Sequence, residues 1–386
     1  MSIPPTPDRI RLVVLYGGRS AEHEISCISA RHVLDAADPQ RYDVRVVGIT
    51  TEGDWVDATS VLGSGGDRAA LPSPDSIVRI DPDHAGVEVG SPGDLDRRGA
   101  VSGPAAVEPV RAVTEPGRGR LVVLPLLHGP MGEDGSVQGL LDVAGVAYCG
   151  TGVGGSAAAM DKGTAKSLLA AAGIPQARWI SLREHEIDDS FPGRVERELG
   201  WPAFVKPANM GSSIGITKAH DRAELVAALE TATRYDEFIV VEEAVNGREL
   251  EIGVLGWPVL RASVPGEIKP SHDFYDFEDK YVDGAAMLDV PASLPPGVAG
   301  EMGRLAIAAC GALRVDSMAR VDFFFEEGGR GLLLNEVNTI PGFTPISMYP
   351  RLWAASGVDY RALVDALVDQ ALRRADRRSR FEVQRR

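Results

Sequence analysis

The most constraining feature of this chain is a pattern of polar residues within two apolar stretches near its C-terminus. The stretches VDFFF and LLLNEVN flank residues 327–331, an arrangement that is typical of a β-hairpin. With a five-residue loop, Asp322 faces Glu336 and Arg320 faces Asn338. Because side chains along a strand alternate between its two faces, all four side chains are expected on one face. The fold must therefore accommodate a hairpin that has a polar face although its strands are apolar enough to be buried.

Two carboxylates on this face, Asp322 and Glu336, indicate a cation site. Like charges opposite each other destabilise a sheet unless a cation lies between them. Oxygen ligands from Asp, Glu and Asn without nearby His or Cys suit Mg²⁺, which takes further ligands from water and substrate phosphates. A solvated face of an ordinary hairpin is the alternative, but buried carboxylates need partners. The hairpin therefore predicts a magnesium platform for nucleotide chemistry.

The composition is that of a globular protein with two or three domains, since 386 residues include 44% hydrophobic and 25% charged ones. The formal net charge of -15 disfavours binding to nucleic acid or to anionic membranes, because both select basic surfaces. No apolar stretch approaches the roughly 20 residues of a membrane span, and the N-terminus lacks a signal pattern, so we expect a cytoplasmic protein. Isolated Cys27, Cys149 and Cys310 disfavour disulfides and structural zinc, and we expect them in the core or in a pocket wall.

Strands alternate with helices in the first third of the chain, which predicts a parallel sheet with its ligand edge at the strands' C-terminal ends. We expect strands over 12–16, 44–50 and 121–127, a helix capped by Ser20, and a helix over 137–144. Gly18, Glu22 and His128 should meet at that edge. Residues 61–118 are rich in Gly, Pro, Asp and Ala, and there we expect a surface insertion of loops and short strands.

The rest of the chain is richer in hairpins. We expect helices over 161–172 and 360–373, strands over 203–207, 238–243 and 249–255, and a basic tail at the C-terminus. Residues 267–289 combine acidic, aromatic and basic residues with little periodicity. Such long segments in compact domains are often functional lids, so we predict a lid loop there.

Several polar residues have both a functional and an ordinary interpretation. The loop from Lys206 through Ser212 and Ser213 to Gly215 can wrap phosphate oxygens, yet it lacks the GKS or GKT of a Walker loop, and a β-turn with an exposed lysine explains it equally well. Two interpretations also remain for polar residues outside this loop. Lys162 fits a helix surface, and Glu242 and Glu249 could be exposed to solvent or contact a nucleoside. Glu22 could interact with a helix dipole or with a substrate, and His128 could have a structural role or contact a substrate.

Seven segments, taken in order, resemble the motif series of the D-alanine:D-alanine ligases of the ATP-grasp superfamily. They are GGRSAEHEIS, HGPMGEDGSVQG, GTGVGGSAAAMDK, FVKPANMGSSIGI, DFEDKY, ARVDFFF and NEVNTIPGFTPISMYP. The resemblance covers nearly the whole chain except residues 61–118 and the tail, and an ordered series is far more specific than any one motif.

The resemblance implies an α/β and α+β chain. A Rossmann-like N-terminal domain over 1–148 would precede an ATP-grasp fold, whose central subdomain spans 149–241 and whose C-terminal subdomain spans 242–376, followed by a basic tail over 377–386. The implied reaction is the ATP-dependent ligation of two D-alanine molecules through an acyl phosphate, releasing ADP and phosphate, for peptidoglycan precursors. The resemblance also implies a homodimer and two Mg²⁺ ions, with Mn²⁺ as an alternative metal.

Roles follow from the resemblance position by position. ATP would be bound by Lys162, Lys206, Ser213, Glu242, Glu249 and Lys280, and the metal by Asp322, Glu336 and Asn338. The substrate residues would be Glu22, His128, Arg320, Gly342, Ser347 and Met348. Arg320 and the N–H of Gly342 would stabilise an oxyanion, and Ser212 and Tyr281 would link Glu22 to the lid. The tyrosine at position 281 favours an amine over D-lactate as acceptor.

Two other classes of protein are compatible with parts of this pattern. A different ATP-grasp ligase, joining a carboxylate to another amine or to a thiol, would lack Glu22, Tyr281 and Ser347 together. A nucleotide-binding protein without catalysis would lose Arg320 or a metal carboxylate. All of these residues are present, which disfavours both classes.

Overall fold

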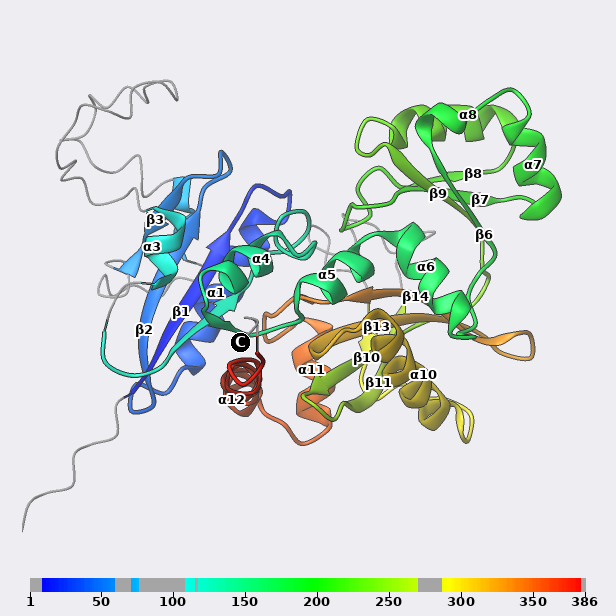
Figure 1. Cartoon of the computed structure of the whole chain (residues 1–386). Coiled ribbons are helices and arrows are strands. Elements are labelled where there is room, and N and C mark those ends of the chain that lie inside the picture. The colour runs from blue at the N-terminus through cyan, green and yellow to red at the C-terminus, as the bar shows by residue number, and fades with distance from the viewer. Residues whose placement is uncertain (1–8, 60–70, 76–107, 115–116, 270–286, 383–386) are drawn as a thin grey trace, which may run out of the picture.

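The computed structural model describes residues 9–59, 71–75, 108–114, 117–269 and 287–382. The described strands form three sheets, with the orders β3-β2-β1-β4-β5, β6-β9-β7-β8 and β12-β11-β10-β13-β14. Figure 1 shows the first sheet on one side of the molecule and the other two on the opposite side, with helix α12 between them. The chain is thus mixed α/β, as predicted. Within the described ranges, no helix combines the length and the apolar character that crossing a membrane requires.

The first sheet is parallel apart from its edge strand β3. Its elements are β1 (Ile10–Gly17), α1 (His23–Ala36), β2 (Tyr42–Ile49), β3 (Trp55–Asp57), α3 (Pro109–Thr114), β4 (Leu121–Pro125), α4 (Ser136–Val143) and β5 (Ala147–Tyr148). The predicted alternation is confirmed, but α1 begins later than expected, because Ser20 belongs to a turn in which its hydroxyl accepts the N–H of Glu22. Most of the predicted insertion over 61–118 lies outside the described residues.

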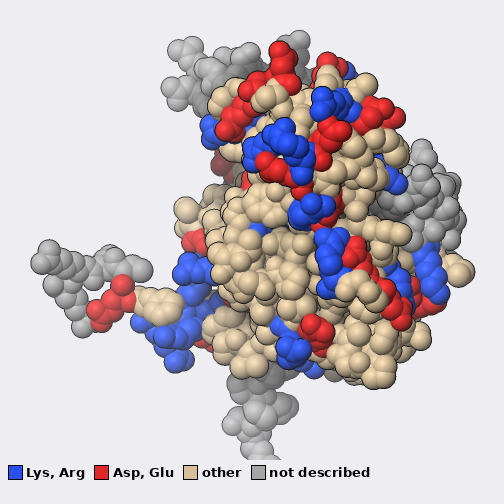
Figure 2. Space-filling view, turned by 90° about the vertical axis from the view of Figure 1, so that its right-hand side faces the viewer, with Lys and Arg blue, Asp and Glu red and all other residues tan. Residues whose placement is uncertain are grey.

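The second sheet is antiparallel and carries two helices on one face. Its elements are β6 (Trp179–Arg183), η3 (Glu184–Glu186), α7 (Phe191–Glu198), β7 (Ala203–Pro207), β8 (Thr217–Ala219), α8 (Arg222–Ala232) and β9 (Phe238–Glu243). Val195 of α7 and Leu225 and Leu229 of α8 are buried against the strands. The outer faces of both helices carry ion pairs, and acidic and basic residues intermix over the upper part of the view in Figure 2.

The third sheet is antiparallel and is covered on both faces. Its elements and covering helices are α5 (Val153–Met160), α6 (Lys162–Ala171), β10 (Arg248–Gly256), β11 (Arg261–Lys269), β12 (Met287–Asp289), α10 (Val298–Leu313), β13 (Ser317–Glu326), β14 (Gly331–Asn338) and α11 (Met348–Ala355). Helices α5, α6 and α10 share an apolar core with β10, β13 and β14. Helix α11 lies on the opposite face, where Trp353 packs against Gly253.

The predicted loop over 267–289 is wrong at both ends. Glu267 pairs with Asp289 and Lys269 with Met287, which places these ends in β11 and β12. Ile268 between them is buried against α11, and Lys269 forms an ion pair with Asp289, so packing and charge hold the two ends together. The middle of the predicted lid, with Lys280 and Tyr281, lies outside the described residues.

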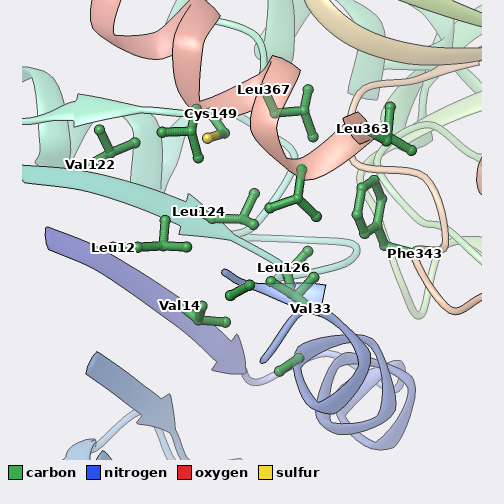
Figure 3. Packing of buried hydrophobic residues seen from close by; sticks show 14 of the residues in the cluster. Leu12, Val14, Val33, Val122, Leu124, Leu126, Cys149, Phe343, Leu363 and Leu367 are labelled. Carbon is green, nitrogen blue, oxygen red and sulfur yellow. The ribbon is translucent and has the colours of Figure 1, made fainter. Parts of the chain in front are cut away.

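The last helix, α12 (Tyr360–Arg378), is longer than the predicted helix over 360–373 and includes the first two residues of the predicted tail. Arg378 pairs with Asp142, and buried Arg374 donates to the carbonyl oxygens of Tyr148 and Gly150, which holds the end of the helix in place. Figure 3 shows Leu367 of α12 above the strands of the first sheet and Leu363 near Phe343, and both leucines belong to the core that includes those strands. The C-terminal helix therefore fastens the first sheet to the rest of the molecule, and the domain boundaries stay a prediction.

Candidate active site

Two cavities meet at the hairpin formed by β13 and β14. The first has a volume of about 580 Å³ and the second of about 690 Å³, both within the range of ligand pockets. Both are lined by Lys162, Met210, Gly211, Ser212, Glu251, Ile268, Arg320, Asn335 and Glu336. The residues predicted for the amino acids line the first cavity, namely Glu22, His128, Gly342, Ser347 and Met348. Those predicted for the nucleotide line the second, namely Lys206, Ser213, Glu242 and Glu249.

The hairpin has the predicted residue pairs, but its loop is shorter than predicted and one strand contains a bulge. Glu326 pairs with Gly331, so the loop is one residue shorter than the predicted loop over 327–331. A register shift next to Asp322 then restores the predicted pairs, Asp322 with Glu336 and Arg320 with Asn338. Such bulges are frequent near active sites because they change the direction of a side chain. The shift leaves Asn335 without a partner in the ladder and at the wall of both cavities.

The guanidinium of Arg320 was predicted on the same face as Asp322, but its ion pair with Asp322 was not. Its Nε and Nη2 donate to the two oxygens of Asp322 at 2.8 and 2.7 Å, and its Nε lies 3.0 Å from Glu251 Oε2. Asn338 Nδ2 donates to Asp322 Oδ2 at 2.9 Å. Burial lowers the pKa of Arg320, but Asp322 and Glu251 outweigh burial and raise this pKa well above its usual value. Asp322 is therefore compensated within the protein itself.

The residues on the polar face also fit the hard-ion site that was predicted. Asp322, Glu336 and Asn338 lie at paired positions of the hairpin, with Asp322 and Asn338 in direct contact, and they offer carboxylate and amide oxygens. Within the described ranges, no group of three His, Cys, Asp or Glu residues is suited to a metal ion, so a metal here would depend on the amide, water and substrate oxygens.

Ser212 links the second sheet to the first across the cavities. Its hydroxyl donates to Glu22 Oε1 at 2.5 Å, and Glu22 is only 9% exposed. Ser212 and Ser213 have φ angles of 50° and 59°, in a region that costs energy for residues other than glycine and that is often found at functional sites. The predicted contact between Ser212 and Glu22 is confirmed, whereas Tyr281 lies outside the described residues.

Glu133 is a site residue that the sequence argument missed. Its carboxylate accepts the N–H groups of Gly129 at 2.8 Å and of Ile340 at 2.9 Å. Burial, and then the charge of Glu22, raise the pKa of Glu133 to about 8. His128 Nδ1 lies 2.9 Å from the carbonyl oxygen of Ile340, while its buried Nε2 has no hydrogen-bond partner among the described residues. An acidic residue in the Gly-rich turn after a buried strand was the signal available in the sequence.

Three charged side chains are buried between helix α6 and the second sheet. Lys166 Nζ lies 3.2 Å from Glu242 Oε2, and Lys206 Nζ lies 3.1 Å from Glu242 Oε1. Burial by itself raises the pKa of Glu242, but the two lysines outweigh burial and lower it to about 2. The solvated alternative for Glu242 is therefore wrong. Lys162 is half-buried, donates to the carbonyl oxygen of Met210 at 2.5 Å and lines both cavities, so it is not a plain surface lysine.

The linings of the two cavities differ in character. Phe204, Ile216 and Phe324 contribute apolar walls to the second cavity, which the half-buried Glu249 also lines. In the first cavity the hydroxyl oxygens of Ser347 and Thr344 are 2.7 Å apart. A Cβ atom at position 342 would lie 3.1 Å from Ser347 Oγ, so glycine leaves room there for the serine.

Comparison with known proteins agrees with this geometry. Residues 11–151 match the family model described as D-ala D-ala ligase N-terminus, and residues 168–369 match that described as D-ala D-ala ligase C-terminus. A curated D-alanine–D-alanine ligase from Mycobacterium sp. (strain KMS) is 47% identical over 382 residues, which covers 95% of this chain and 97% of the relative. The D-alanine–D-alanine ligase from Coxiella burnetii has a similar structure, with a TM-score of 0.76 at 32% identity over 96% of each chain. The VanG D-Ala:D-Ser ligase from Enterococcus faecalis has a TM-score of 0.76 at 30% identity, over 94% of this chain and 99% of its own. The chain therefore belongs to the D-alanine–D-alanine ligase family of enzymes.

Proposed function

We propose that this enzyme joins two molecules of D-alanine to D-alanyl-D-alanine and converts ATP to ADP and phosphate. The observation that carries the proposal is the wall that the two cavities share, which includes Lys162, Arg320 and Glu336. An amino acid in one cavity and a nucleotide in the other would meet at this wall. Phosphoryl transfer depends on positioning and on neutralisation of spread negative charge, so cations at the junction suffice and no nucleophilic side chain is needed.

In the first step, a carboxylate oxygen of the first D-alanine attacks the γ-phosphorus of ATP, and the bond to the β-phosphate oxygen breaks to leave ADP and an acyl phosphate. Lys162, Lys206 and Lys280 neutralise the phosphates. Glu22 binds the ammonium group of this D-alanine, and His128 lies nearby. The contact from Ser212 supports this role, because it orients a carboxylate that is almost completely withdrawn from water.

The nucleoside and the metal use residues of the second cavity and of the hairpin. Glu249 would accept hydrogen bonds from the ribose and Glu242 from the adenine amino group. Both residues line the second cavity, where the carboxylate of Glu242 also contacts Lys166 and Lys206. Ser213 would contact the phosphates. Mg²⁺ held by Asp322, Glu336 and Asn338 would supply further neutralisation of the phosphate charge.

In the second step, the free amine of the second D-alanine attacks the acyl carbon, and the tetrahedral intermediate expels phosphate as the amide forms. The N–H of Gly342 and the guanidinium of Arg320 stabilise the oxyanion, and a planar fork suits this role better than a point charge. Ser347 binds the carboxylate of the second D-alanine, next to Met348. To Tyr281 we assign a hydrogen-bonding role with Ser212 and Glu22, and exclusion of water from the site protects the acyl phosphate from hydrolysis.

Finer features of the protein belong to the same proposal. We assign a Rossmann-like fold to the N-terminal region, supported by its parallel strands, and an ATP-grasp arrangement to the remainder. We further propose that the enzyme is a cytoplasmic homodimer that supplies the dipeptide for peptidoglycan precursors.

A coupled assay of ADP release tests the proposed function. D-Alanine, L-alanine, D-serine and D-lactate are offered in turn, with Mg²⁺ present or chelated, and the D-serine arm addresses the likeness to a D-Ala:D-Ser ligase. We expect ADP release with D-alanine and Mg²⁺, dipeptide as the product, and no release after chelation. A folded enzyme that releases no ADP with D-alanine would overturn the proposal.

A further inference from the structure

Lys166 is a buried cation for which the proposed reaction has no role. Its side chain is 2% exposed, and it lies one helical turn after Lys162 on α6. Its ammonium group lies 3.2 Å from Glu242 Oε2, the one ion pair that it forms among the described residues. Burial lowers the pKa of Lys166, while Glu242 acts in the opposite direction. Even when paired, a buried ammonium carries a desolvation cost, so its presence at this position calls for an explanation.

The carboxylate of Glu242 is held from two sides. Lys166 on α6 contacts Oε2, whereas Lys206 on β7 contacts Oε1. Because β7 lies next to β9 in the sheet, Lys206 approaches from within the sheet and Lys166 from the helix above it. Lys206 and Glu242 line the second cavity, while Lys166 lines the first, whose wall also includes Glu336.

The charges of this triad explain what a second lysine adds. Glu242 and Lys206 alone would form a neutral pair, in which the carboxylate competes with any phosphate for the ammonium group of Lys206. With Lys166 included, the three formal charges sum to +1, so one positive charge stays available to an anion in the cavity. The carboxylate also keeps a single orientation, because each of its oxygens has its own cation.

We propose that Lys166 is a positioning residue of the nucleotide site, which acts through Glu242 to keep Lys206 available to the phosphates. The inference rests on the proposed function only in that the natural ligand is ATP. Direct contact of Lys166 with the nucleotide does not account for its position, because its nitrogen is buried and Glu242 lies between it and Lys206.

Binding of ADP, measured by titration calorimetry without any D-alanine, tests this role independently of turnover. We expect Lys166→Met to weaken ADP binding about tenfold and adenosine binding less than about twofold, because only ADP carries phosphates. Lys166→Gln keeps a donor to Glu242 without the charge, so its affinity for ADP should lie between those of the wild type and of Lys166→Met. This variant also covers the case in which the methionine variant does not fold.

A double-mutant cycle with Glu242→Gln tests whether Lys166 acts through Glu242. If it does, adding Lys166→Met to Glu242→Gln changes ADP affinity by less than about threefold, because the intermediary is already neutral. Arg374→Met is the matched control: it removes another buried cation, one that contacts Asp316 and backbone carbonyls, and should lower thermal stability with ADP affinity unchanged.

Two results would overturn the proposal. One is a folded Lys166→Met or Lys166→Gln variant that binds ADP as the wild type does. The other is a double variant whose fold-loss in ADP affinity equals the product of the fold-losses of the two single variants. In turnover, the same variants should raise the KM for ATP and leave the KM for D-alanine unchanged. Failure of the wild type to use D-alanine refutes the proposed function instead, and leaves the ADP measurements to decide the role of Lys166.

Discussion

Replacing Ser212 by alanine removes the hydroxyl that joins the second sheet to Glu22. The lost bond is a hydrogen bond of 2.5 Å to a carboxylate that is 9% exposed, so water replaces it poorly. Hydrogen bonds to charged groups contribute roughly 1.5–3 kcal/mol, and a loss of about 2 kcal/mol corresponds to about 30-fold. We expect kcat/KM for D-alanine to fall by this factor, because Glu22 loses the contact that orients it toward the ammonium group.

Ser213→Ala is the matched control for this experiment. Both serines have positive φ angles, 50° and 59°, so an alanine at either position meets a similar backbone cost. Ser213 lines only the second cavity, and its alanine variant should change the KM for ATP and leave kcat/KM for D-alanine intact. The assay is ADP release with D-alanine varied at saturating ATP. A Ser212→Ala variant within twofold of the wild type, or an equal effect of both variants on D-alanine, would refute the reasoning.

Four further predictions concern chemistry and stability. Arg320→Lys keeps the charge but loses the planar donor fork that contacts Asp322, so dipeptide formation should slow by about 10²-fold, measured by product analysis, and a wild-type rate contradicts the oxyanion role. Glu336→Gln should nearly abolish turnover at saturating Mg²⁺ without lowering the melting temperature, and near-normal activity argues against a metal role. The pKa of Glu133 is raised to about 8, above its ordinary value of 4.5, so the folded state retains a proton that the unfolded chain loses. This stabilisation is complete below pH 4.5 and is lost as the pH rises through 8, so the melting temperature should fall less between pH 5 and 8 in Glu133→Gln than in the wild type, and parallel pH curves contradict the shift. Arg374→Met leaves carbonyl oxygens and a carboxylate without their buried cation, which should cost about 3–5 kcal/mol of unfolding free energy by calorimetry, and an unchanged transition shows that the cation is dispensable.

Local sequence patterns were sufficient to predict most of the strands that carry the site residues. The strand over 238–243 was predicted with the bounds that β9 has, and the predicted strand over 203–207 coincides with β7. Such strands are short apolar runs bounded by turn residues, and their signal lies in neighbouring positions. The prediction of a loop at both ends of the 267–289 segment was wrong for the opposite reason. The strand partners of Glu267 and Lys269 lie about twenty residues away, so no local pattern reveals the pairing.

Among the active-site residues, too, some were recognised from a local pattern, whereas others are identified only by partners that the fold brings to them. Asp322 and Glu336 were recognised because alternation along a strand is a property of the chain itself. Their predicted pairing holds because the one-residue bulge at Asn335 offsets the shorter loop. Lys166 and Glu133 were not recognised, because a buried charge is identified by its partners. Those partners are Glu242 for the lysine and the N–H groups of Gly129 and Ile340 for the glutamate, and most of them lie far away in the sequence.

The order of amino acids alone thus specified the polar face of the hairpin, the succession of strands and helices, and the motif series of the family. Alternation, turn chemistry and capping act over a few residues and can be read without coordinates. Only tertiary structure determined that Arg320 forms ion pairs with Asp322 and Glu251, why Glu242 is ionised, and how α12 closes the core of the first sheet. These properties depend on burial and on distances between residues remote in the chain, because electrostatic interactions strengthen only after packing has excluded water.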